Sequence, residues 1–330
     1  MGRRGWRLML WATLGCATVT ACPSPYSDDG ARASDAGSDA TGDAGGNDGT
    51  DGAPGDAGVL PDASACDPQK PFSTPVMIAE LSSTAQDYSL AFTADERTVI
   101  LASTRLDGGQ QLFVASRANV GDPFPAPVPL AIPDANTATA PSLTPDGGLL
   151  FFELPTADAG FDLYSTTRLA TADIAYDVPL PLAELNTDAN ELAPAISADG
   201  NEVFFVSSRT GQQAIYRSTR TAAGPFRPPA LVNEIFLDGG REIAPVLSAD
   251  GTTLYFAADS TSGLGALDIW VATRPSRVEV FGAPRPLPEL SSTASDQPVW
   301  VSPDGCRLYL ASGRGGPSRV FDFYVATKPR

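Results

Sequence analysis

The chain has 330 residues, of which 42% are hydrophobic and 18% charged, and it contains 4 Cys and no His. The absence of His excludes Ser-His-Asp and Cys-His catalysis, zinc sites with imidazole ligands and an imidazole pH switch. The 22 basic and 39 acidic residues give a net charge of −17. This charge argues against nucleic acid as a partner, because the phosphate backbone would be repelled.

Residues 1–21 have the three parts of a secretory signal peptide: basic residues, an apolar stretch and small residues at the end. The segment Val19-Thr20-Ala21-Cys22 resembles the lipobox of bacterial lipoproteins, in which the Cys is lipidated and becomes the first residue of the mature protein. We therefore predict lipidation at Cys22. Cys16 is a weaker site, and a simple cleaved signal peptide is the alternative.

A lipid on Cys22 would hold the protein on a membrane without a spanning helix, for which the apolar stretch is too short. Pro23 follows this cysteine, and the absence of Asp there is what lipoproteins destined for the outer membrane usually show. The sequence therefore predicts a lipid-anchored protein of the bacterial cell envelope, most simply in the outer membrane. Whether it faces the periplasm or the outside is left open.

Residues 22–67 show no hydrophobic periodicity and are rich in Asp, Gly and Ala. The stretch from Asp28 to Asp67 contains ten Asp and one Arg. Such a composition does not bury enough apolar surface to offset the entropy of ordering, so we predict a disordered linker. The Asp spacing lacks the ligand order of a calcium-binding loop, and no metal site is expected.

An internal repeat predicts the fold of residues 68–330. One segment, read as Pro-Ala-Ile-Ser-Ala-Asp-Gly at 194–200, recurs five times. Its turn aspartates are Asp95, Asp146, Asp199, Asp250 and Asp304. Apolar runs flank each turn, as in a β-hairpin, and a third run rich in aromatic and β-branched residues follows. A fourth segment carries an aromatic residue and Pro, which fits an edge strand. Each unit therefore predicts a four-stranded propeller blade.

The segment before the first unit supplies the edge strand that the last unit lacks. The last unit stops after its third strand, whereas the missing edge pattern occurs before the first unit, at Phe72-Ser73-Thr74-Pro75. We therefore predict an all-β, five-bladed β-propeller over residues 68–330, closed by an N-terminal strand that joins the last blade.

The repeat also carries a family resemblance. The pattern Pro-x-Leu-Ser-x-Asp-Gly, an aromatic strand, Ser-x-Arg and Asp-Ile-Tyr/Trp-Val-x-Thr-Arg resembles the WD40-like repeat of TolB-like periplasmic proteins. The resemblance covers essentially the whole predicted propeller and implies that fold. It implies little about function, since propellers serve binding, scaffolding and catalysis alike. TolB itself has a further N-terminal domain, in whose place this chain has the acidic linker.

Two cysteines remain once the signal peptide and the lipidated residue are set aside. Cys306 directly follows the turn of the last blade, and Cys66 precedes the strand that closes that blade. In an oxidising compartment we predict a disulfide between them, with two free thiols as the alternative.

Four acidic residues recur at the start of the predicted innermost strands. They are Asp87, Glu191, Glu242 and Asp296, with Ala138 in the second blade. Arginines recur ten residues after the turn aspartates; they are Arg105, Arg209 and Arg314, with Thr156 and Ser260 in the other two blades. Either the acids and arginines pair and hold neighbouring strands together, or the acids form a ring at one mouth of the channel that binds a cation or a basic partner. The turn aspartates are expected to be structural.

These patterns predict a monomeric, non-catalytic platform that binds an envelope protein or a glycan, without a cofactor. The alternative is a glycoside hydrolase, in which two of the channel carboxylates would act as acid and base. The four acids follow the repeat, however, whereas catalytic residues usually depart from one.

Overall fold

The computed structural model describes residues 66–330 except for a few short segments. The segments outside this description are 107–108, 158–159, 172–173, 223, 238–239, 261–262 and 316–319, together with residues 1–65. The predicted signal peptide, the lipidation site at Cys22 and nearly all of the predicted linker 22–67 therefore lie outside the described residues.

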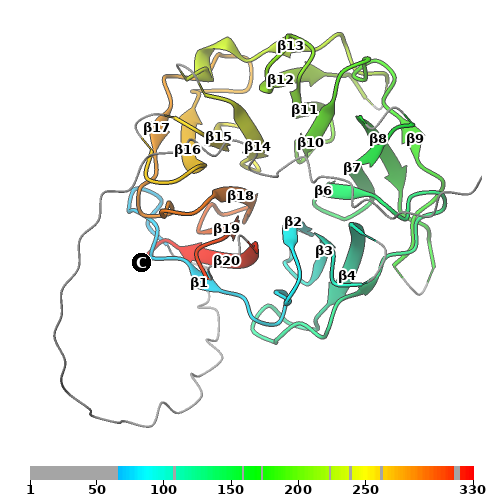
Figure 1. The fold of residues 1–330 in the computed structure, drawn as a ribbon, viewed down its shortest axis with the longest axis horizontal. Helices are drawn as coiled ribbons and strands as arrows, with labels where there is room; N and C mark the ends of the chain where they lie inside the picture. Colours follow the sequence, from blue (N-terminus) through cyan, green and yellow to red (C-terminus); the bar gives the residue numbers. More distant parts are fainter. Residues whose placement is uncertain are drawn as a thin grey trace, which may run out of the picture. The chain divides into compact units, whose positions relative to one another are not determined.

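The structure is an all-β ring of five four-stranded antiparallel sheets, which confirms the predicted five-bladed propeller (Figure 1). The strands nearest the axis are β2 (Asp87–Phe92), β6 (Thr139–Leu143), β10 (Glu191–Ile196), β14 (Glu242–Leu247) and β18 (Asp296–Val301). The second strands are β3 (Thr98–Ser103), β7 (Leu149–Pro155), β11 (Glu202–Ser207), β15 (Thr253–Ala258) and β19 (Arg307–Ser312).

The third strands are β4 (Gln111–Ser116), β8 (Phe161–Thr167), β12 (Ala214–Thr219), β16 (Asp268–Thr273) and β20 (Asp322–Thr327). The outer strands are β1 (Val76–Met77), β5 (Val128–Pro129), β9 (Leu180–Pro181), β13 (Ala230–Leu231) and β17 (Arg285–Pro286). A 3-10 helix, Asn233–Ile235, is the one helical element among the described residues, and no helix in that part of the chain has the length and hydrophobicity to cross a membrane.

Each hairpin between an innermost and a second strand turns in the same way. A Ser or Thr hydroxyl two residues before the turn aspartate donates to it, as from Ser248 to Asp250 at 2.6 Å. The same carboxylate accepts a backbone N–H two residues later, as from Thr252 at 2.9 Å. The residue directly after the turn aspartate is Gly in four blades, with φ between +68° and +73°, a region that Gly adopts at no steric cost. The structural role predicted for these aspartates follows from these bonds.

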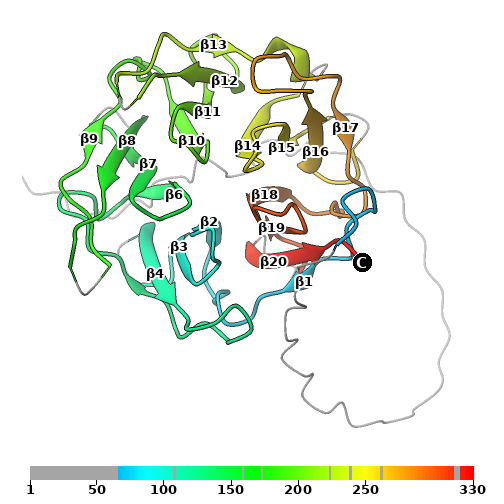
Figure 2. The same ribbon diagram turned by 180° about the vertical axis from the view of Figure 1, so that it is seen from behind.

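The ring is closed at its ends as the sequence predicts. Strand β1 pairs with β20, so that the N-terminal strand completes the last blade beside the C-terminus (Figure 2). Cys66 and Cys306 form a disulfide with a Cα–Cα distance of 5.8 Å across 240 positions of sequence. Both lysines of the chain lie at the same junction, where Lys328 Nζ donates to the Pro68 carbonyl at 2.7 Å and Lys70 Nζ to that of Arg330 at 2.5 Å.

The predicted edge strands are shorter than the sequence pattern indicates. Each outer strand has two residues, and the aromatic residue of the pattern lies before it. The aromatic ring instead packs against a cation at the end of the third strand. The pairs are Arg117 on Phe124 at 4.2 Å, Arg220 on Phe226 at 4.7 Å, Arg274 on Phe281 at 4.6 Å and Lys328 on Phe72 at 4.9 Å. The aromatic residue of the pattern thus has a structural role in a cation–π contact.

The apolar core lies mainly between neighbouring blades. Phe92 of the first blade contacts Tyr309 of the last, with ring centroids 4.6 Å apart, and Phe151 of the second contacts Phe226 of the third at 6.3 Å. Each blade therefore depends on its neighbours for burial, and opening the ring would expose apolar surface on two blades.

Candidate functional site

The four recurring acids begin the innermost strands, but they are not exposed at the mouth of the channel. Asp87, Glu191 and Asp296 have 0% of their surface exposed and Glu242 has 1%. Three of them pair with the recurring arginines: Asp87 with Arg105 at 2.7 Å, Glu191 with Arg209 at 3.2 Å and Asp296 with Arg314 at 2.6 Å. The structure thus brings the predicted residues together as buried ion pairs.

Each of these pairs also fixes the loop that precedes the innermost strand. In the third blade, Glu191 accepts the backbone N–H of Thr187 at 2.7 Å, while Arg209 donates to the carbonyl of Leu185 at 2.6 Å. The first and last blades repeat both bonds with their own residues. The carboxylate oxygens are therefore satisfied inside the protein, and the interpretation of these acids as an open binding ring is wrong. They hold strand and loop together.

Glu242 departs from the other three acids because its blade has Ser260 in the arginine position. Its carboxylate accepts the N–H of Leu237 at 2.9 Å, and burial raises its pKa to about 7. Arg241, next to it, pairs instead with Asp259 at 3.4 Å. This carboxyl group therefore lacks the cation that compensates its counterparts.

Glu153 is a buried carboxyl group that the sequence analysis missed. It lies in β7 with 0% of its surface exposed, accepts the Thr139 hydroxyl at 2.7 Å and accepts the N–H of Ala193 in the next blade at 2.8 Å. Burial raises its pKa to about 7. At this strand position the other blades have Ala102, Val206, Ala257 and Ala311. This single departure from the repeat was the available signal.

Glu153 should make stability fall as the pH rises. Its pKa of about 7 exceeds the ordinary 4.5, so the folded protein holds the proton more tightly than the unfolded chain. The stabilisation is fully present below about pH 4.5 and is lost by about pH 7; the shift corresponds to about 3 kcal/mol. Urea unfolding of Glu153→Gln should show a smaller decline between pH 5 and pH 8 than the wild type. The exposed control Glu184→Gln should keep the full decline, and an unchanged decline in Glu153→Gln would contradict this account.

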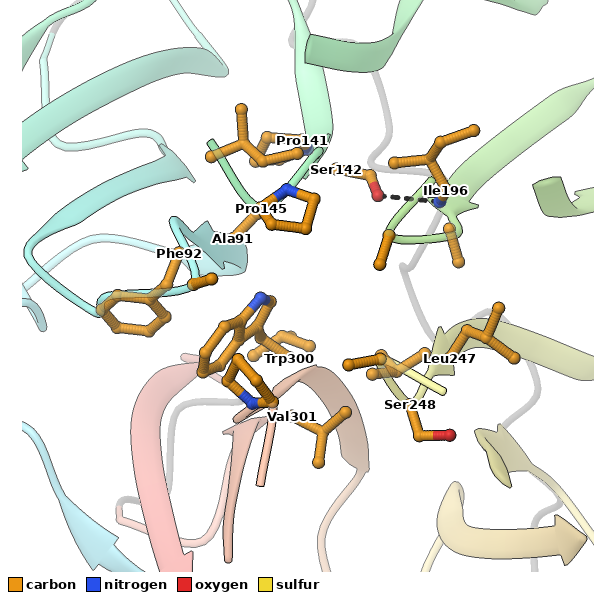
Figure 3. A pocket seen from close by; sticks show the side chains of 18 of the residues that line it. Ala91, Phe92, Pro141, Ser142, Pro145, Ile196, Leu247, Ser248, Trp300 and Val301 are labelled. Carbon is orange, nitrogen blue, oxygen red and sulfur yellow. Dashed lines mark hydrogen bonds between the residues drawn. The ribbon is translucent and has the colours of Figure 1, made fainter. Parts of the chain in front are cut away.

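The accessible feature on the axis lies at the other end of the innermost strands, beside the aspartate turns. A cavity of about 90 Å³ is lined there by all five blades, through side chains such as Ala91, Pro141, Ile196, Leu247 and Trp300 (Figure 3). The described residues around it are apolar except for two serines, and none is titratable. Its chemistry therefore suits apolar contacts and not proton transfer.

Trp300 makes this cavity asymmetric. The other innermost strands have small or β-branched residues four positions before the turn aspartate: Ala91, Ser142, Ala195 and Val246. Trp300 is half-buried, and its ring lies 5.0 Å from that of Phe92 and 5.5 Å from that of Tyr309. An aromatic surface is thus presented on one side of the mouth (Figure 3).

No protein-family model and no curated protein matches the chain. Solved structures do match. TolB from Acinetobacter baumannii has 17% sequence identity and a TM-score of 0.45, and the match covers 76% of this chain but only 57% of that one. The chain is a five-bladed β-propeller. The propeller fold that the repeat resemblance implied is confirmed by the strand order of the five sheets.

Two glycoside hydrolases are similar in the same way. A thermostable family-43 glycoside hydrolase has 11% identity and a TM-score of 0.52, with 75% of this chain and 90% of that chain covered. The catalytic domain of the Coprinopsis cinerea GH62 alpha-L-arabinofuranosidase has 13% identity and a TM-score of 0.51, with 79% and 98% covered. At these identities the likeness concerns the fold, and function has to be argued from the side chains.

Proposed function

We propose that this propeller is a non-catalytic binding platform of the bacterial cell envelope, held there by a lipid on Cys22. Its partner is an envelope protein that inserts an apolar side chain into the axial cavity beside the aspartate turns. The supporting observation is the lining of that cavity, which is apolar and comes from all five blades, with Trp300 on one side. A protein loop fits these walls better than a glycan, whose hydroxyl groups need polar partners.

The alternative, hydrolysis of a glycan, needs two carboxyl groups that reach a substrate. Glu153 and Glu242 have the raised pKa values of about 7 that suit a general acid. Glu153, however, is fully buried, and both of its oxygens accept hydrogen bonds within the protein. Asp87, Glu191 and Asp296 are held in ion pairs. The described side chains thus favour binding.

The proposal is tested by capture from solubilised envelope with the full chain carrying a C-terminal tag. Ala249 lines the cavity and is exposed, so Ala249→Arg adds charge to the mouth without leaving a void. The amount of a partner protein captured by the wild type should fall at least tenfold with Ala249→Arg. Capture should be unchanged with Ala126→Arg, a substitution at another exposed alanine, near an outer strand.

Two results would overturn this proposal. One is equal capture by the wild type and Ala249→Arg, which would place the partner elsewhere. The other is release of sugar from envelope polysaccharide by the wild type that is abolished in a Glu242→Gln variant that melts like the wild type, because it would establish the hydrolase alternative.

A further inference from the structure

The five interfaces between successive blades are filled differently beside the aspartate turns. At the interface of the last and first blades, Glu96 takes the place of the turn glycine and is 3% exposed. Its carboxylate accepts hydrogen bonds from Arg307 at 3.0 Å and from the Tyr309 hydroxyl at 2.8 Å. Arg307 and Tyr309 are the first and third residues of β19. A carboxylate therefore occupies the space between these two blades.

Three further interfaces are filled by the protein's own side chains. Between the third and fourth blades, Glu202 pairs with Arg274 at 2.9 Å. Between the first and second, a Cβ on Gly147 would come within 3.1 Å of the Thr93 methyl group. Between the second and third, a Cβ on Gly200 would lie 3.8 Å from a methyl group of Leu149 and 3.9 Å from that of Thr144.

The interface of the fourth and last blades is open. A Cβ on Gly305, the counterpart of Glu96, would meet nothing within 4 Å. Thr253 and Tyr255 stand where Arg307 and Tyr309 stand in the filled interface, and Lys328 directly follows β20, the third strand of the last blade. Gly305, Tyr255 and Lys328 line one groove of about 750 Å³, a volume within the range of small-molecule sites.

The groove contains cationic side chains with unused hydrogen-bond donors, alongside the carboxylates of Asp250, Asp304 and Glu289. Arg285 lines it and is exposed, and its guanidinium makes no hydrogen bond or ion pair within the described part of the chain. Lys328 Nζ donates one hydrogen bond to the Pro68 carbonyl and lies 4.9 Å from the Phe72 ring centroid, and it has two further N–H donors. The Tyr255 hydroxyl has no hydrogen-bond partner among the described residues. These three side chains can together bind a carboxylate, as Arg307 and Tyr309 bind that of Glu96.

The remaining wall suits hydroxyl groups. Hydroxyls and carboxylates line it, namely those of Ser248, Thr252, Thr273, Asp250, Asp304 and Glu289. Carboxylates and hydroxyls accept hydrogen bonds from a polyol, while they would repel a second anionic group. The largely buried rings of Phe72 and Tyr255, with centroids 6.4 Å apart, form an apolar part of the lining.

We propose that this groove binds a sugar acid, a ligand with one carboxylate and several hydroxyl groups such as a uronic acid. The carboxylate contacts Arg285, Lys328 and the Tyr255 hydroxyl, and the ligand's hydroxyl groups face Asp250, Asp304 and the threonines. The groove adjoins the axial cavity, with which it shares Ser248, Ala249, Val301 and Pro303, but its proposed ligand does not depend on the function proposed for that cavity.

Calorimetric titration of the full chain with D-galacturonate, D-glucuronate and D-galactose tests the proposal. We expect saturable binding of at least one uronate, at least tenfold tighter than that of galactose. Arg285→Gln should weaken it at least tenfold, whereas Arg227→Gln, a change at an exposed arginine of the third blade, should leave it unchanged.

A second variant imitates the interface between the last and first blades, which Glu96 fills. Gly305→Glu should place a carboxylate in the groove, as Glu96 does, and abolish uronate binding. Gly305→Ala should retain binding, since it introduces the same backbone strain at φ +69° without the carboxylate. Thermal melting verifies that each variant is folded. The proposal is overturned if neither uronate shows saturable binding, if galactose binds equally well, or if Gly305→Glu binds like the wild type.

Discussion

Replacing both Cys66 and Cys306 by Ser should lower the free energy of unfolding by about 4 kcal/mol, within the range for loss of a native disulfide. The bond joins positions 240 apart, so it strongly restricts the unfolded chain. In the folded protein it fastens the segment before β1, an outer strand of only two residues. Without it, the last blade can lose its outer strand, and the core between the last and first blades becomes accessible.

This expectation is measured by urea unfolding of the oxidised wild type and the double variant. Reductant should lower the stability of the wild type to that of the variant and should leave the variant unchanged. Equal stability of the oxidised wild type and the variant would contradict a role of the disulfide in ring closure.

Glu96→Gln should destabilise the protein by about 3–5 kcal/mol, the effect of removing one partner of a buried ion pair. Arg307 is 6% exposed and has its guanidinium on the Glu96 carboxylate, with the Tyr309 hydroxyl on the same group. The substitution keeps the shape of the side chain but leaves a buried cation without its counter-charge. The interface between the last and first blades should weaken in consequence.

The neighbouring residue provides a matched control. Arg97 pairs with Asp95 at 2.8 Å, but both side chains are about half exposed, at 55% and 49%. Arg97→Gln should therefore cost less than about 1 kcal/mol. Urea unfolding of both variants at neutral pH compares the two pairs. A loss of less than 1 kcal/mol for Glu96→Gln would show that the buried pair contributes no more than the exposed one.

The fold was readable from the sequence because the same local chemistry recurs five times. Every turn needs an aspartate to accept the N–H two residues later, and four of the five use Gly for a positive φ. The displaced edge pattern at Phe72 indicated ring closure, which the pairing of β1 with β20 confirms. The pairing of Cys66 with Cys306 followed from that topology.

The site was less readable, because burial is a property of the assembled ring. The sequence positions of Asp87 and Arg105 are compatible either with a ring of exposed acids at the channel mouth or with a buried ion pair. Only their contact at 2.7 Å in the structure decides between the two. Glu153 was visible as a departure from the repeat, but its role depends on Ala193 in another blade.

The sequence by itself determined the number of blades, the hairpin turns and the way the ring closes, since these depend on local hydrogen bonding and on the order of repeats. Only the tertiary structure decided which charges are buried and which interface stays open. Gly147, Gly200 and Gly305 are equivalent in sequence, but side chains of their surroundings fill the space beside the first two and leave a groove beside the third. The physical reason is that packing between blades depends on residues far apart in the chain, which no single repeat specifies.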